Sequence, residues 1–338
     1  MSILVSGGIG FIGSHTVVEL LKAGYDVVVF DNFYNSKPCV IERIKKITGR
    51  DFKFYEADML DGAALDRIFD ENKIDAVIHF AGLKAVGESV AIPLKYYHNN
   101  IEGTLTLCDR MAAHGVKRIV FSSSATVYGD TDIVPMREDM PVTSATNPYG
   151  ETKLVIERIL SDLAVSDPEW SVSCLRYFNP IGAHESGLIG EDPMGIPNNI
   201  VPRIQKVVAG EWSEITVFGT DYPTPDGTGV RDYIHVTDLA QAHIAALHRV
   251  ESVSGWECYN IGCGHGYSVM EIIDAYERAC GSPIKRKIEP RRPGDIAVSY
   301  ADPAKAKTVL GWEAKLTLDD MCRDAHHFRV CNPNGYEE

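Results

Sequence analysis

The chain has 338 residues, of which 45% are hydrophobic, and a formal net charge of −14. This length supports a large buried core in one large domain or two unequal ones, and the negative charge argues against a general binder of nucleic acids or membrane surfaces. No apolar run is long enough to span a membrane, and a strand-like segment at 3–5 leaves no room for a signal peptide. We therefore expect a cytoplasmic protein with neither a nucleic-acid nor a membrane partner.

Eight cysteines are scattered along the chain without short paired spacings, which is typical of reduced core thiols and not of a disulfide framework. Cys258, Cys263 and His265 lie close together, but in a glycine-rich stretch with no fourth ligand at a typical spacing. We expect no metal site.

Short runs rich in β-branched residues alternate with amphipathic segments over the first half of the chain. The runs predict buried strands at 3–6, 27–30, 53–55, 76–80, 118–122 and 172–175. The amphipathic segments predict helices that include 16–22, 64–70, 104–113 and 154–163. Such βαβ repetition predicts an α/β fold of the Rossmann type, a doubly wound parallel sheet with helices on both faces.

A glycine fingerprint joins the first strand to the first helix, with Gly7, Gly10 and Gly13 at its key positions. Glycines in this context allow a tight turn, close approach of the backbone to a pyrophosphate and close packing of the helix. Phe11 and Ile12 belong to the same predicted cofactor loop. The alternative is an ordinary strand-to-helix turn.

Asp31 ends the second predicted strand, 18 residues after Gly13. A carboxylate there accepts hydrogen bonds from the adenosine ribose and repels a 2′-phosphate, so NAD is favoured over NADP. Asn32, Asn35 and Ser36 are its neutral neighbours in the predicted cofactor site. The alternative is an ordinary surface aspartate.

Three further strands end in small or polar residues, at the edge where open parallel sheets bind ligands. At these ends we expect cofactor contacts from Asp58, Met59, Phe80, Ala81, Gly82 and Ser122. The serine run 122–124 is also compatible with simple turn chemistry. Together with a tyrosine and a lysine farther along the chain, Ser124 is expected to bridge substrate and base.

Tyr149 and Lys153 stand four residues apart, just after Asn147 and Pro148. Asparagine as N-cap and proline at the first helical position favour a helix that starts here, which places phenol and ammonium on one face. A free tyrosine has a pKa of about 10, so a base near neutrality requires a lowering worth about 4 kcal/mol. One cation about 4 Å away supplies roughly that much. Burial opposes this lowering of the tyrosine pKa, and an oxidised nicotinamide ring beside the phenol would add a second positive charge that favours it.

The alternation of strands and helices ends near Asn179, beyond which prolines and glycines are frequent. We predict an NAD-binding Rossmann domain over 1–180 and a smaller, substrate-binding α/β domain over 181–338. A helical pattern at 238–247 and a strand-like run at 258–261 leave open whether the segment 233–262 packs back on the first domain.

Five stretches carry family-specific patterns in a fixed order, at 79–89, 122–129, 176–180, 190–199 and 227–236. With them the chain resembles, nearly end to end, the extended short-chain dehydrogenase/reductase family and, within it, the UDP-galactose 4-epimerases. The resemblance implies tightly held NAD and reversible epimerisation of UDP-galactose and UDP-glucose at C4 through a 4-keto sugar. It also implies a homodimer joined through helices of the NAD domain, and a place in galactose metabolism.

The resemblance further implies roles for individual residues. Tyr149 removes the proton of the sugar 4-hydroxyl, Lys153 binds the nicotinamide ribose and lowers the tyrosine pKa, and Ser124 assists proton transfer. The cofactor site also includes Lys84, Asn99 and Phe178, and the nucleotide-sugar site includes Asn179, Asn199, Phe218, Arg231, Tyr233, Arg292 and Asp295. The arginines also make physical sense independently, since a diphosphate needs cations with bidentate donors. The alternative for Arg231 and Arg292 is that they are ordinary solvated charges, and Arg291 competes with Arg292 for this role.

Ser299 falls where some family members have a bulky tyrosine that lines the sugar pocket and others a small residue. A small side chain leaves room for a 2-acetamido group, so we expect UDP-N-acetylglucosamine and UDP-N-acetylgalactosamine also to be substrates. In the alternative, Tyr300 turns inward and closes the gap.

Other functions share this fold. A nucleotide-sugar 4,6-dehydratase usually has Asp-Glu after the serine strand end, where this chain has Ala125 and Thr126. Uronate or pentose 4-epimerases and decarboxylating relatives are separated only by testing sugars. A non-catalytic dinucleotide sensor need not keep Ser124, Tyr149 and Lys153 together.

Overall fold

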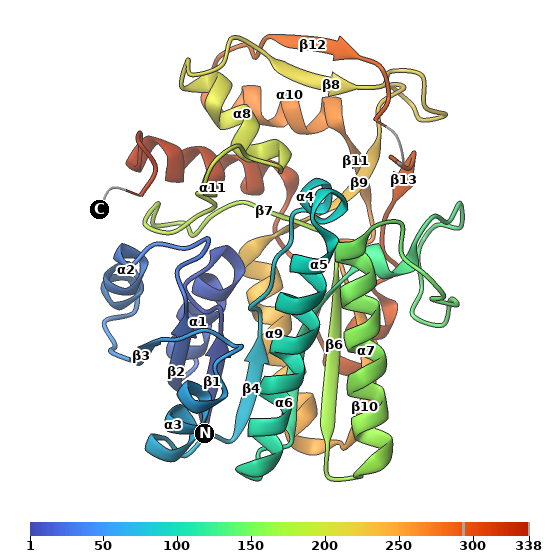
Figure 1. Ribbon diagram of the computed structural model, residues 1–338. Helices are drawn as coiled ribbons and strands as arrows, with labels where there is room; N and C mark the ends of the chain where they lie inside the picture. The colour runs from blue at the N-terminus through green and yellow to red at the C-terminus, as the bar shows by residue number, and fades with distance from the viewer. Residues whose placement is uncertain (293–294, 337–338) are drawn as a thin grey trace.

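The computed structural model describes residues 1–292 and 295–336, and its largest element is a parallel seven-stranded sheet (Figure 1). The strand order is β10-β6-β5-β4-β1-β2-β3, and neighbouring strands pair in parallel throughout. The strands are β1 (Ser2–Ser6), β2 (Asp26–Asp31), β3 (Lys53–Glu56), β4 (Ala76–His79), β5 (Arg118–Ser124), β6 (Ser171–Tyr177) and β10 (Gly255–Ile261). All six strands predicted from the first half of the sequence are present, and the doubly wound α/β class is confirmed.

Two hydrophobic cores cover the two faces of this sheet, because successive side chains of a strand point to opposite faces. Ile3 and Val5 of β1 pack in one core, and Leu4 packs in the other. Helices α1 (Phe11–Lys22), α2 (Cys39–Thr48) and α9 (Val236–Ser252) contribute to the first core. Helices α3 (Gly62–Glu71), α6 (Gly103–Ala113) and α7 (Pro148–Ser166) contribute to the second. The four helices predicted from amphipathic segments lie within α1, α3, α6 and α7, whereas α2 was not predicted.

A smaller lobe lies beyond the carboxyl ends of the strands (Figure 1). Its strands are β7 (Asn179–Ile181), β9 (Val230–His235), β11 (Gly266–Ser268) and β13 (Val298–Ser299) in one sheet, with β8 (Ile215–Phe218) and β12 (Arg286–Glu289) as a separate pair. Its helices are α8 (Ile200–Val208), α10 (Val269–Cys280) and α11 (Leu318–Cys331). This region is therefore richer in regular structure than its prolines and glycines indicated.

The chain passes between the two regions more than once. It leaves the large sheet after β6, enters the lobe, and returns with α9 and β10 before it enters the lobe again. Short helices, α4 (Val86–Ala91) and α5 (Pro93–Tyr96), with a π-helical turn at Tyr97–Glu102, link β4 to α6, and further short turns occupy Ala125–Tyr128 and Ala306–Leu310. Within the described residues, no helix has both the length and the apolar character needed to cross a bilayer.

The strand order reverses direction at β1, which lies between β2 and β4. Crevices at such reversals, outside the carboxyl ends of the strands, are where open α/β sheets bind ligands. Here the loops that follow β1 and β4 touch, since a Cβ added to Gly7 would lie 2.8 Å from the amide nitrogen of Ala81. The fold therefore positions the predicted site at this edge of the sheet.

Candidate active site

The glycine loop has the geometry that a bound dinucleotide requires. Gly7 has a φ of +66°, and Gly10 stands at the N-cap of α1. A Cβ added to Gly13 would lie 2.3 Å from the carbonyl oxygen of Gly7, so the helix approaches the loop at a distance that side chains exclude. Phe11 and Ile12 form the first turn of α1. The loop and the start of α1 fit a pyrophosphate, which binds at helix N-termini of this kind.

Asp31 lies at the end of β2 and is held by the glycine loop. Its carboxylate accepts hydrogen bonds from the backbone of Ile9 (3.1 Å) and Phe33 (2.9 Å) and from the hydroxyl of Ser36 (2.7 Å). Burial raises the pKa of Asp31, and these hydrogen bonds oppose that shift. The carboxylate is thus fixed beside the loop, in the position from which an adenosine ribose is recognised.

The other predicted adenosine-side residues lie in three different surroundings. The side-chain amide of Asn32 donates to Asp58 (2.8 Å), so the ends of β2 and β3 are joined. Asn35 instead accepts from the backbone of Met194 (3.1 Å), which connects this loop to the lobe. Met59 is 5% exposed and packs in the core with α3 and α6.

The loop after β4 is held by a residue that the sequence did not single out. Asn100 accepts a hydrogen bond from the backbone of Leu83 (2.8 Å) and lies against Gly82, where an added Cβ would be 3.3 Å from its Oδ1 atom. The predicted Asn99 donates to the same oxygen (2.9 Å). Phe80 packs on His243, with ring centroids 4.6 Å apart. Asn100 was hidden by its neighbour Asn99, because the sequence alone does not say which of two adjacent amides faces inward.

The start of α7 confirms the predicted capping. Asn147 is the N-cap and accepts a hydrogen bond from the backbone of Gly150 (2.9 Å), and Pro148 is the first helical residue. Tyr149 and Lys153 lie one turn apart, with the lysine Nζ 6.0 Å from the centroid of the tyrosine ring. Lys153 also donates to the carbonyl oxygen of Ser122 (2.6 Å), and burial lowers its pKa to about 8.

Tyr149 is the partly buried phenol of the site. Burial raises its pKa, and hydrogen bonding with Ser124 opposes that shift. Ser124, the last residue of β5, accepts hydrogen bonds from the backbone (3.2 Å) and hydroxyl (2.9 Å) of Thr126. In the protein alone, burial raises the pKa of Tyr149 more than the Ser124 hydrogen bond lowers it. Further positive charge beside the ring is therefore needed for the phenol to act as a base near neutrality. An oxidised nicotinamide supplies such a charge.

The predicted substrate residues of the lobe form a charged cluster. Asp295 pairs with Arg231 (2.5 Å) and with Arg292 (3.0 Å), and the guanidinium of Arg292 lies 4.8 Å from the centroid of the Phe218 ring. Arg291 points elsewhere and pairs with Asp221 (2.7 Å). The structure therefore brings Arg292, and not Arg291, into the cluster.

The remaining lobe residues lie on the sheet around β9. Asn179 of β7 is in register with Tyr233, and Ser299 of β13 is in register with Arg231. Burial raises the pKa of Tyr233 to about 12. Ser299 is also buried, and its hydroxyl lies 3.8 Å from the sulfur of Met136. Phe178, just before β7, is buried in a small core beside α7.

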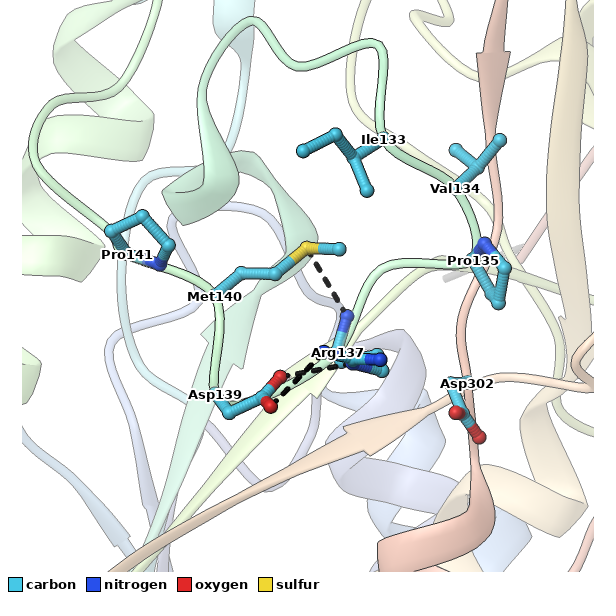
Figure 2. Close-up of a pocket in the computed structure, with 8 residues that line it drawn as sticks. All are labelled: Ile133, Val134, Pro135, Arg137, Asp139, Met140, Pro141 and Asp302. Atoms are coloured by element: carbon cyan, nitrogen blue, oxygen red, sulfur yellow. Dashed lines mark hydrogen bonds and ion pairs between the residues drawn. The ribbon is translucent and has the colours of Figure 1, made fainter.

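A separate pocket lies between the segment 133–141 and Asp302 (Figure 2). It has a volume of about 370 Å³, and the described residues that line it include none of the predicted site residues. Arg137 in its wall is paired with Asp139 (3.0 Å), as the dashed lines in Figure 2 show. Because Arg137 is already paired with a carboxylate, it is less available to bind a phosphate. The edge of the sheet is therefore the better candidate for a nucleotide site.

Glu191 is a second residue that the sequence did not single out. Its carboxylate is 7% exposed, and its Oε1 atom accepts from the side-chain amide of Asn199 (2.5 Å) and lies 3.5 Å from the Nζ of Lys84. It thus touches one residue predicted for the cofactor and one predicted for the substrate. The stretch 190–199 was recognised as a family pattern, but two adjacent acids there, Glu191 and Asp192, cannot be told apart by sequence.

Comparisons with known proteins agree with this geometry. Residues 3–262 match the model of the NAD dependent epimerase/dehydratase family. The UDP-glucose 4-epimerase of Bacillus subtilis is 59% identical over 337 residues, covering 100% of this chain and 99% of that protein. A crystal structure of the UDP-glucose 4-epimerase from Bifidobacterium longum, in complex with NAD+ and UDP, is 56% identical, with a TM-score of 0.96 over 99% of this chain and 100% of that one.

A third similar protein is the UDP-glucose 4-epimerase of Stenotrophomonas maltophila, whose crystal structure contains NAD and formylated UDP-arabinopyranose. It is 49% identical, with a TM-score of 0.96 and coverage of 98% of both chains. These matches extend over the large sheet and the lobe alike. The chain belongs to the NAD dependent epimerase/dehydratase family, among its UDP-glucose 4-epimerases.

Proposed function

We propose that this chain interconverts UDP-galactose and UDP-glucose by inverting the configuration at C4 of the sugar, with NAD as a tightly held cofactor. The observation that carries the proposal is the meeting of Tyr149, Lys153 and Ser124 at the carboxyl edge of the parallel sheet, beside a glycine loop that fits a dinucleotide. The similarity to UDP-glucose 4-epimerases over the full chain supports the same substrate class.

In this proposal, Tyr149 carries the proton in both halves of the reaction. As a phenolate it removes the proton of the sugar 4-hydroxyl, and as a phenol it returns a proton when the 4-keto sugar is reduced on its other face. Bound NAD accepts the hydride from C4 and later gives it back. Lys153 stabilises the phenolate through its charge, and Ser124 bridges the sugar hydroxyl and the phenol.

Other parts of the chain bind the portions of NAD and of the UDP-sugar that do not react. We assign NAD to residues 1–180, together with the returning α9 and β10, and the UDP-sugar to the lobe. Arg231 and Arg292 are the cations for the diphosphate, and Asp295 orients both guanidiniums. Phe218 presents an aromatic face next to Arg292.

Finer features belong to the same proposal. Ser299 is small and sits beside Arg231 on the sheet of the lobe, which supports acceptance of 2-acetamido sugars as further substrates. A homodimer belongs to the proposal as well, and Val90 of α4 and Leu94 of α5 are exposed apolar side chains on two contacting helices of the first region that could take part in it. We also propose a cytoplasmic location.

The direct test is to incubate the purified protein with UDP-galactose, without added NAD, and to follow the sugar C4 configuration by proton NMR. Formation of UDP-glucose supports both the reaction and the retained cofactor. If no conversion occurs even after NAD is supplied, the proposed substrate is rejected. UDP-uronates and UDP-pentoses are then the next substrates to test, followed by simple dinucleotide binding.

A further inference from the structure

Glu191 occupies an unusual position between the two ligand-binding regions. Its carboxylate is almost fully buried, whereas its partner Lys84 has a side chain that is 49% exposed. Burying a carboxylate is costly unless it is paired and hydrogen-bonded. Lys84 and Asn199 both reach the Oε1 atom of this carboxylate, so one oxygen is shared by the two residues that we assign to different ligands.

The backbone on either side of Glu191 is fixed independently of these contacts. The amide of Gly190 donates to the hydroxyl of Tyr336 (2.8 Å). The carboxylate of Asp192 accepts from the backbone of Tyr336 (2.8 Å) and pairs with Lys37 (3.1 Å). Because its neighbours are anchored to the C-terminal segment, Glu191 is a rigid support, and Lys84 and Asn199 adjust to it.

We propose that Glu191 is a positioning residue that orients Lys84 toward the cofactor and Asn199 toward the UDP-sugar through one carboxylate oxygen. The inference rests on the proposed function, because the ligands of Lys84 and Asn199 are part of it. Its consequence is that one residue, expected to touch neither ligand itself, sets the affinity for both. Loss of the carboxylate therefore weakens NAD retention and UDP binding together.

Two substitutions of different severity test this inference. Glu191→Gln keeps an acceptor but removes its charge, and charge-assisted hydrogen bonds are about twice as strong as neutral ones. We expect UDP to bind about fivefold more weakly to this variant, and about 20-fold more weakly to Glu191→Ala, which lacks the acceptor altogether. UDP affinity is measured by calorimetry on protein saturated with added NAD. NAD retention is measured separately, as the cofactor released per chain after gel filtration.

Asp192→Asn is the matched control, because it removes the adjacent carboxylate from the same segment. The asparagine side chain keeps an oxygen that can accept from the Tyr336 backbone and loses the ion pair with Lys37, so Asp192→Asn should lower the unfolding temperature slightly without changing the dissociation constant of UDP by more than about twofold. If Asp192→Asn weakens UDP binding as much as Glu191→Ala does, the effect is one of general loosening and the inference is wrong. The inference is also wrong if the Glu191 variants bind UDP and retain NAD as the wild type does.

A double-mutant cycle shows whether Glu191 acts through Asn199. Asn199→Ala combined with Glu191→Ala should weaken UDP binding little more than either change alone, since both break the same contact. Additive losses would overturn the positioning role. These readouts are of binding and do not depend on turnover, so a wild-type protein that binds UDP but fails to convert UDP-galactose refutes the proposed reaction and leaves this inference open to its own test.

Discussion

The edge of the large sheet and the lobe assemble their side chains in different ways. At the edge of the sheet, each predicted residue lies within a few positions of a strand end or a helix start, such as Asp31 after β2 and Tyr149 at the start of α7. In the lobe, Phe218, Arg231 and Asp295 come from segments far apart in the sequence and meet through ion pairs and a ring contact. The site residues at the sheet edge are therefore positioned by nearby strand ends and helix starts, whereas those of the lobe are positioned by contacts between segments distant in sequence.

The two regions also differ in their electrostatics. Lys153 is buried and Tyr149 is partly buried, and burial shifts the pKa of each away from its ordinary value, toward the uncharged form. The lobe instead carries two partly exposed arginines, Arg231 and Arg292, that share the one carboxylate of Asp295 and so keep a net positive charge. A group with a shifted pKa is suited to moving protons, and a pair of arginines with excess positive charge is suited to holding an anion. Changes at the sheet edge should thus lower kcat, whereas changes in the lobe should alter affinity or selectivity.

The largest effect is expected for Tyr149→Phe. Without the phenol oxygen, no group at this position takes the proton of the 4-hydroxyl, so we expect kcat to fall by about a thousandfold or more. UDP affinity, which we assign to the lobe, should stay within about twofold. Turnover by NMR and UDP binding by calorimetry check both parts. A variant that retains a tenth of the wild-type kcat would exclude Tyr149 as the acid/base group.

Gly13→Ala tests the packing of the cofactor loop. The added Cβ would lie 2.3 Å from the carbonyl oxygen of Gly7 and 2.8 Å from the Cα of Gly8, so backbone must move. We expect a loss of about 3 kcal/mol in the free energy of unfolding, measured by urea denaturation, and loss of retained NAD.

Gly87→Ala is the control for this change, because an added Cβ there meets no described atom within 4 Å outside its own chain neighbours and the backbone of its helix. Gly87 lies in α4, where alanine is the better helix former, so this variant should be as stable as the wild type or slightly more so. Equal destabilisation by the two substitutions would show that the close approach at Gly13 is unimportant.

Ser299→Tyr tests selectivity in the lobe. A phenol at this position would fill the space that a 2-acetamido group needs, so we expect activity on UDP-N-acetylgalactosamine to fall by about a hundredfold, the scale that steric exclusion in a pocket reaches. Activity on UDP-galactose should change by less than about threefold. Ser299→Ala, which stays small, should keep both activities. Unchanged selectivity in Ser299→Tyr would mean that Tyr300 or another side chain sets the size of the pocket.

The sequence predicted the sheet edge in more detail than the lobe for a physical reason. Buried parallel strands are continuous apolar runs, and turn and cap residues such as Gly7 and Asn147 follow directly from backbone geometry. Strands β1 to β6 and the start of α7 could therefore be predicted from the sequence. Helix α2 was not predicted, although it is as long as α3 and its apolar residues Val40, Ile44 and Ile47 recur at helical spacing.

The lobe was read as rich in loops, although two local signals for helices were present. Ser268 and Glu271 form a capping box at the start of α10, and Thr317 and Asp320 do the same for α11. The contacts between distant segments of the lobe had no comparable signal in the sequence. Which of the adjacent arginines joins Asp295, and which acid of the stretch 190–199 meets Asn199, depends on how distant segments pack.

The smallest effect, and the sharpest test of the lobe, is expected from comparing Arg292 with Arg291. Arg292→Met removes one of the two cations paired with Asp295, and we expect UDP to bind about tenfold more weakly, with kcat changed by less than about threefold. Arg291→Met removes a guanidinium that is engaged with Asp221, and should change UDP affinity by less than about twofold. The two variants lose the same charge at adjacent positions, so net charge alone predicts equal effects. A larger loss for Arg291→Met would reverse the assignment and show that the diphosphate lies on the Asp221 side. A large fall in kcat for Arg292→Met would show that the lobe takes part in catalysis as well as in binding.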